Sequence, residues 1–202
     1  MTTLSASPAS TRSGTTVALT VIAGTMMIPL DLTVVAVALS RLAEETGESA
    51  FFSIRRGAET VCLLREEGSF PVRSHVLHEG IRFPLGVASA GLAILSFLPE
   101  RERHAYLEAA DLADGYGDAH ATGALRDRVR ATRTRGYSVN PGLIVAGSWG
   151  LGAAVFDVRE EPRWALSITG IETRLAPPRQ RDLGELLLRE AHDLSRQLPG
   201  GL

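Results

Sequence analysis

Small and hydroxyl-bearing residues gather on two neighbouring apolar segments of this chain. Residues 145–158 are mostly Gly, Ala, Val and Phe, and residues 164–170 resume an apolar pattern that ends in Thr169 and Gly170. The charged, proline-containing stretch 159–162 between them is typical of a hairpin turn slightly longer than two residues. Strands lined with Gly, Ser and Thr leave open space on their face, and a few hydroxyls beside such space can hold a small molecule. The pattern therefore predicts a ligand pocket on this hairpin.

Elsewhere the sequence shows no pattern of catalytic or metal-binding residues. His75 and His78 lie three residues apart, but no third metal ligand is visible beside them. The sequence contains no recognisable phosphate loop, nucleophile elbow or pair of catalytic carboxylates. The single cysteine, Cys62, lies in an apolar strand-like run and is expected to be a small buried hydrophobe. We therefore expect no enzyme activity, no metal and no cofactor.

The composition fits one domain with a short extension. The chain has 202 residues, of which 45% are hydrophobic, and its formal net charge is −2. This balance gives no electrostatic reason to expect nucleic-acid binding. One cysteine excludes a disulfide within the chain and favours a reducing compartment such as the cytoplasm. One cluster of arginines is offset only by Asp127, and it indicates a solvated helix face or, as the less favoured alternative, a phosphate-binding patch. The cluster comprises Arg126, Arg128, Arg130, Arg133 and Arg135.

The N-terminal residues differ in composition from the rest of the chain. Residues 1–16 are rich in Ser, Thr and Ala, which predicts a disordered tail. Residues 17–39 form an apolar stretch whose one charge is Asp31, and the stretch is long enough to cross a bilayer. It is open whether this stretch is a membrane anchor, a secretory signal peptide or the start of another gene joined near Arg41. We expect an apolar helix over residues 17–40, with a transmembrane segment as one interpretation of it, followed by a globular domain over residues 41–202.

The globular part is predicted to belong to the α+β class, because antiparallel strands are flanked by helices. Alternation and turn residues predict strands over residues 50–54, 59–65 and 72–76, ahead of the hairpin described above. Helical periodicity predicts a short helix over 41–46, a buried helix over 86–97, and amphipathic helices over 100–112, 121–134 and 183–198.

Three blocks of residues stand out by their exact residue sequence as well as by their periodicity. The first combines RGY, AAVFD and ALSITG at residues 135–137, 153–157 and 165–170. The second is FPLGVASAGLAILSFLP at residues 83–99, and the third is LAEETGES at residues 42–49. In this order they resemble the effector-binding domain of the isocitrate-lyase-regulator (IclR) family of transcription factors, over about residues 41–198. The resemblance implies a GAF-like, profilin-like fold in which a curved antiparallel sheet cups the ligand.

The resemblance also implies a binding site. Members of this family bind small effectors, often carboxylates or aromatic compounds, between the sheet and the buried helix. The positions that match the site are Ser89, Ala90, Asn140, Ser148, Gly150, Ser167 and Thr169. We favour ligand contact for Ser167 and Thr169. For Ser89, ligand contact and simple packing are equally favoured. Trp149 and Trp164 could border the pocket, but we favour core packing for both.

The function that the resemblance implies is that of an effector-sensing domain for a small organic acid or an aromatic effector. It implies a homo-oligomer, either a dimer or a tetramer. The winged helix-turn-helix reader of the family has no counterpart in residues 1–39, so DNA binding by this chain alone is not expected. An alternative comes from residues 28–39, which resemble the first transmembrane helix of major facilitator superfamily multidrug antiporters. In that alternative the chain is a membrane-tethered protein or a transporter-derived fusion whose globular domain is a relic. The expected location in either case is cytoplasmic, with a tether to the membrane through residues 17–39 left open.

Overall fold

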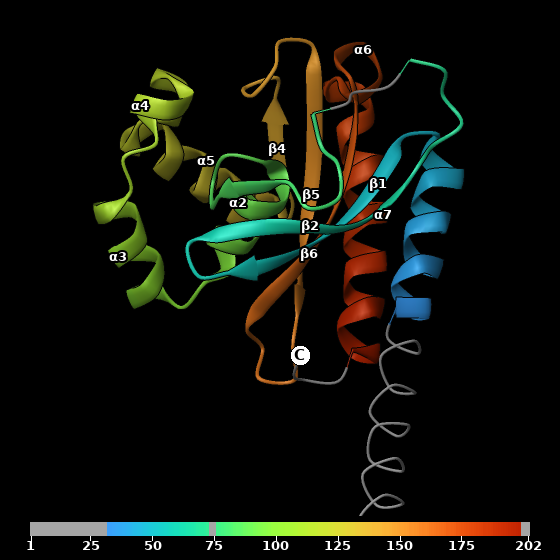
Figure 1. Ribbon diagram of the computed structural model, residues 1–202, viewed down its shortest axis with the longest axis horizontal. Coiled ribbons are helices and arrows are strands. Elements are labelled where there is room, and N and C mark those ends of the chain that lie inside the picture. The colour runs from blue at the N-terminus through green and yellow to red at the C-terminus, as the bar shows by residue number, and fades with distance from the viewer. Residues whose placement is uncertain (1–31, 73–75, 199–202) are drawn as a thin grey trace, which may run out of the picture. The chain divides into compact units, whose positions relative to one another are not determined.

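The globular part of the chain is built around one six-stranded antiparallel sheet (Figure 1). The computed structural model describes residues 32–72 and 76–198, and the compact unit that holds the sheet begins at Val34. The strand order is β3-β2-β1-β6-β5-β4, so the two long hairpins meet where β1 pairs with β6 in the middle of the sheet. The sheet is curled and flanked by helices, as predicted for an α+β fold.

Two long hairpins and two short edge strands supply the sheet. The strands are β1 (Ser49–Arg56), β2 (Glu59–Glu66), β3 (Arg82–Pro84), β4 (Ser138–Pro141), β5 (Ser148–Phe156) and β6 (Pro162–Ile171). Gly57 makes the turn of the first hairpin with a φ of 63°, a conformation that glycine adopts without steric cost. Both long hairpins agree with the prediction from apolar runs broken by charged or glycine-containing turns.

The third strand lies further along the chain than predicted. Residues 72 and 76, at the ends of the strand expected over 72–76, lie in bends, and residues 73–75 are outside the described residues. The third strand is instead β3, which pairs with the start of β2. The residue before β3 also lies alongside β2, because the backbone N of Cys62 donates to the carbonyl of Ile81 at 3.0 Å.

One face of the sheet is covered by the helix at residues 32–46, called the N-terminal helix here, and by α7 (Pro177–Gln197) (Figure 1). Val35, Leu39 and Leu42 recur every three or four residues and face the shared core. Leu187 and Leu194 of α7 enter the same core. The helix α7 begins earlier than the expected residue 183, because prolines in a first turn need no intrahelical donor.

The opposite face carries the buried helix and its neighbours. These helices are α2 (Ser89–Phe97), α3 (Glu100–Ala109), α4 (Ala113–Tyr116) and α5 (Thr122–Arg135), with a 3₁₀ helix at Asp118–His120. A short α6 (Glu172–Leu175) follows β6. The helix α2 is buried on all sides, as its apolar composition predicted. It begins at Ser89 rather than at residue 86, because Gly86 adopts a φ of 92° that an α-helix does not contain.

The apolar helix expected over residues 17–40, for which a membrane span was one interpretation, falls mostly outside the described residues. Within residues 32–72 and 76–198, no helix is both long enough and apolar enough to cross a membrane. Val35, Ala38 and Leu39, at the end of that stretch, are only 2–6% exposed and pack in the core against the sheet. The described end of the apolar stretch is therefore a core-packing part of the globular unit, and its hydrophobicity has that physical reason.

Candidate functional site

Two rows of small polar residues cross the sheet on the side that faces α2. In one row, Asn140, Gly150 and Thr169 are cross-strand neighbours on β4, β5 and β6. In the next row, Gly152 and Ser167 are neighbours in the same way. Alternate residues of a strand point to the same face, so Ser167 and Thr169 lie on the α2 side of β6. The sequence pattern of small and hydroxyl-bearing residues therefore marks one continuous patch beneath a helix.

The glycines of β5 give room for the start of α2. A Cβ atom at Gly150 would lie 3.0 Å from the Ser89 hydroxyl oxygen. At Gly152 it would lie 2.8 Å from the backbone oxygen of Ser89, which a real Cβ does not approach so closely. The glycine at position 150, predicted as a ligand contact, is thus explained in the structure by its approach to the helix.

Two side chains of β4 hold the turn that leads into α2. The Ser138 hydroxyl donates to the carbonyl of Ser89 at 2.7 Å. The Asn140 amide donates to the carbonyl of Val87 at 2.8 Å, and the backbone N of Leu143 donates to the Asn140 side-chain oxygen at 2.8 Å. Asn140 is therefore a positioning residue that fixes both the helix start and the following loop.

A small cavity lies between these rows, the start of α2 and two loops. Its lining residues are Val76, Leu77, Ala88, Ser89, Asn140, Ile144, Ser148, Trp149, Gly150 and Thr169. Most of the predicted site positions are brought together here, whereas Ala90 and Ser167 do not line the cavity. The volume open to a water-sized molecule is about 20 Å³, which is room for about one water. In this conformation the cavity is too small for an organic ligand.

Two unsatisfied hydroxyls lie on β6, one in the cavity lining at Thr169 and one outside it at Ser167. Among the described residues, Oγ of Ser167 and Oγ1 of Thr169 are buried and have no hydrogen-bond partner. Thr169 is 6% exposed and lines the cavity. The first turn of α2 has no side-chain cap, so its backbone N–H groups also lack a side-chain acceptor. Hydroxyl and N–H donors in this arrangement suit a carboxylate oxygen.

The apolar wall of the cavity was not predicted from the sequence. Leu77 and Ile144 come from loops, where periodicity gives no signal, and no site was expected there. Trp149 is half-buried, packs against the core as expected, and also lines the cavity, which was the alternative for this residue. Trp164, by contrast, is 3% exposed in the core as expected. An apolar residue inside a predicted loop is the signal that could have pointed to this wall.

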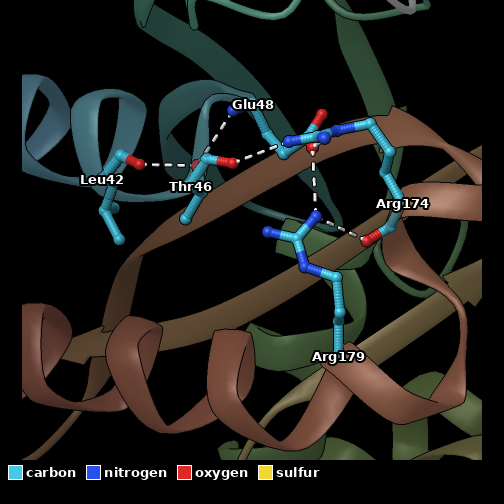
Figure 2. A network of polar contacts seen from close by, with 5 residues as sticks. All are labelled: Leu42, Thr46, Glu48, Arg174 and Arg179. Carbon is cyan, nitrogen blue, oxygen red and sulfur yellow. Dashed lines mark hydrogen bonds and ion pairs between the residues drawn. The ribbon is translucent and has the colours of Figure 1, made fainter.

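A buried carboxylate lies beside the end of β6 (Figure 2). Glu48 is 2% exposed, forms an ion pair with Nε of Arg174, and lies 3.8 Å from Nη1 of Arg179. Arg174 Nη2 donates to the carbonyl of Thr46 at 3.0 Å, and the Thr46 hydroxyl donates to the carbonyl of Leu42 at 2.6 Å. This network connects the end of the N-terminal helix to the segment that follows β6, the strand that carries Thr169.

Comparison with known proteins places this chain in a family of bacterial regulators. Residues 30–196 match the family described as "Bacterial transcriptional regulator IclR C-terminal", and the chain belongs to that family. It is 28% identical over 161 residues to the HTH-type transcriptional regulator KipR of Bacillus subtilis, covering 79% of this chain and 64% of that protein. It is 26% identical over 165 residues to the transcriptional repressor IclR of Escherichia coli, covering 78% and 58%. The crystal structure of IclR from Thermotoga maritima aligns with a TM-score of 0.77 at 25% identity, over 83% of this chain and 68% of that chain.

The chain therefore carries the C-terminal, effector-binding domain of IclR-type transcriptional regulators, as the three sequence blocks indicated. The relatives are named as transcriptional regulators and repressors, a class distinct from enzymes. The chain spans 58–64% of the length of the two curated relatives just described. The family match begins at residue 30, within the stretch that was compared with an antiporter helix, and the antiporter resemblance finds no support among these matches.

Proposed function

We propose that this domain senses a small organic acid or aromatic carboxylate in the cavity between α2 and the sheet, and that it does so as part of a transcriptional regulator. The observation that carries the proposal is Thr169, whose buried hydroxyl lines the cavity and has no hydrogen-bond partner among the described residues. Family membership supports the effector role.

The chemistry of the cavity favours a carboxylate joined to an apolar group. The Thr169 hydroxyl and the uncapped N-terminus of α2 supply donors to a carboxylate, and the positive end of the helix dipole favours a negative charge there. Leu77, Ile144 and Trp149 supply the apolar wall that an aromatic or aliphatic group would contact. Ser167 lies behind Thr169 on β6 and offers a second hydroxyl once the cavity widens.

Binding requires the cavity to open. A drug-sized ligand occupies a pocket of roughly 300–1,000 Å³, whereas the cavity here offers about 20 Å³. The polar floor is formed by strands that are hydrogen-bonded to each other, so we expect the described loop residues Leu77 and Ile144 to be the part of the wall that moves outward. We expect induced widening from the loop side, with the strands unchanged.

The test is a calorimetric titration of the full chain with a panel of small aliphatic and aromatic carboxylates. Thr169→Val keeps the shape of the side chain but removes the hydroxyl, so we expect at least about a tenfold loss of affinity for the acid that binds. Thr132→Val is the matched control. Thr132 is 0% exposed and its Oγ1 also lacks a partner among the described residues, but it lies on α5 outside the cavity. Equal affinity in the two variants would contradict the site.

We also propose that the chain assembles as a homo-oligomer, a dimer or a tetramer, since the family relatives are transcriptional regulators. Sedimentation velocity on the full chain tests this directly. A single species with the mass of one 21.6 kDa chain at micromolar concentration would contradict it.

A further inference from the structure

An open groove on the α2 side of the sheet is lined by four arginines. It lies between the end of α2, α3 and α5, the helices that are grouped on one side of the sheet in Figure 1. Its volume is about 470 Å³, which is within the range of small-molecule sites. The lining residues are Phe97, Arg103, Leu107, Arg126, Val129, Arg130, Arg133 and Thr134. None of them lines the cavity beneath α2.

Two of these arginines carry a charge that no carboxylate balances through an ion pair. Arg126 pairs with Glu108, and Arg130 pairs with Asp127 at 2.5 Å. Within residues 32–72 and 76–198, neither Arg103 nor Arg133 forms an ion pair with an acidic side chain. The groove therefore keeps an excess of positive charge after its internal pairs are counted.

Both unbalanced guanidinium groups are held in place by the backbone. Arg103 Nη1 donates to the carbonyl of Leu98 at 2.8 Å, and Arg133 Nη1 donates to the carbonyl of Ser96 at 2.8 Å. These contacts cap the end of α2, but each uses one of the five N–H donors of a guanidinium. Burial and the nearby charge of Arg133 lower the pKa of Arg103, while Glu100 opposes the shift. The two cations are thus fixed near each other with donors to spare.

The floor of the groove is apolar. Leu107 is 7% exposed and Val129 is 5% exposed, and both belong to the core around α2. Phe97 is half-buried and packs edge-on against Phe156, with ring centroids 5.9 Å apart. A ligand that fits this groove has an apolar part for the floor and negative charge for the rim.

We propose that this groove binds a small dianion joined to an apolar group, of the aryl phosphate type, at a site separate from the cavity beneath α2. Two fixed guanidinium groups match two negative charges, and the planar fork of arginine suits the oxygens of a phosphate. The sequence leaves two interpretations of the arginine cluster, a solvated helix face and a phosphate-binding patch. Phosphate binding is thereby assigned to Arg133 of that cluster, together with Arg103 from the neighbouring helix α3.

The probe is phenyl phosphate, titrated calorimetrically into the full chain at low ionic strength. We expect saturable binding that Arg103→Gln and Arg133→Gln each weaken by about tenfold or more. The matched control is Arg181→Gln, because Arg181 is an exposed arginine outside the groove. Inorganic phosphate lacks the apolar part and phenol lacks the charge, so both should bind more weakly than phenyl phosphate.

A second pair of variants covers the possibility that loss of a helix cap unfolds the protein. Thr134→Glu places a negative charge on the exposed rim of the groove without removing either arginine, and it should weaken phenyl phosphate binding. Thr122→Glu adds the same charge at the other end of α5 and should not. No saturable binding by the unaltered chain, or equal binding in Thr134→Glu and Thr122→Glu, would overturn the proposal. Loss of phenyl phosphate binding in Thr169→Val would also overturn it, because the phosphate would then occupy the cavity beneath α2.

Discussion

The proposed binding site depends on the hydroxyls of Ser167 and Thr169. Within the described part of the chain, neither hydroxyl has a hydrogen-bond partner although both are buried. A buried polar group without a partner costs about 1–3 kcal/mol, so a valine or an alanine would suit a purely structural role better. The neighbouring Ile168 shows that choice on the opposite face, where the side chain packs in the core. A ligand bound as proposed above would give the Thr169 hydroxyl its missing partner.

Glu48 is predicted to be the most sensitive charged residue of the fold. Glu48→Gln would leave the guanidinium of Arg174 beside a neutral amide, and Arg174 is only 26% exposed. We expect the free energy of unfolding to fall by about 2 kcal/mol, less than the 3–5 kcal/mol typical of a fully buried pair. Urea unfolding of the two proteins measures this difference.

The control for that variant is Glu185→Gln. Its pair with Arg181 joins side chains that are 51% and 83% exposed, and such surface pairs contribute about 0–1 kcal/mol. If both substitutions change the stability equally, the network in Figure 2 does not have the structural role assigned to it.

At the scale of the elements, the position of α2 against the sheet determines the site. The start of α2 is fixed by hydrogen bonds from Ser138 and Asn140, and its end is capped by Arg103 and Arg133. The glycines of β5 allow the close approach between the helix and the strand. Because both ends are held, we expect ligand-driven movement in the loops beside α2 and not in the helix itself.

Gly152→Ala tests the close approach of α2 to the sheet. The new Cβ would lie 2.8 Å from the Ser89 carbonyl oxygen, a backbone atom that cannot rotate away. We expect a destabilisation of about 1–3 kcal/mol, as for other overpacked positions. Gly123→Ala on α5 is the matched control, because a Cβ there meets nothing within 4 Å and alanine is the better helix former. Thermal unfolding that shows equal effects of the two substitutions would contradict this packing.

We predict that stability depends on pH through His120, at the end of the 3₁₀ helix. His120 is 1% exposed, and burial lowers the pKa of its imidazole below the ordinary value of 6.5, with the charge of Arg128 contributing in the same direction. The unfolded chain therefore binds this proton more readily, so the contribution of the neutral ring is full above pH 6.5 and is lost as the pH falls below it. Urea unfolding at several pH values from 7 to 5 should show a decline that is smaller in His120→Gln. An unchanged decline in that variant would exclude His120 as its source.

The elements that were predicted correctly are those with strong local patterns. The hairpin of β1 and β2 follows from alternation around Gly57, and the burial of α2 follows from its unbroken apolar composition. The short strand β4, at Ser138–Pro141, was missed because four residues carry too little periodicity and its partner lies beyond a loop. The same reason hid the wall residues Leu77 and Ile144, which reach the cavity only through tertiary packing.

At the scale of the whole molecule, the sheet joins the cavity to the N-terminal helix. Thr169 lines the cavity and pairs across the sheet with Ser49, the residue after Glu48. The Glu48 network then reaches Thr46 and Leu42 at the end of that helix. A change at the floor of the cavity therefore has a short route of direct contacts to the element that leads toward the N-terminal part of the chain.

A crystal structure of the full chain with the acid that binds most tightly in the titration shows directly whether Thr169 contacts the ligand. We expect a carboxylate within hydrogen-bond distance of Thr169 Oγ1 and of the first N–H groups of α2. We also expect Leu77 and Ile144 to be displaced outward while β4, β5 and β6 keep their register. An acid bound away from Thr169, for example in the arginine-lined groove of α3 and α5, would contradict the account.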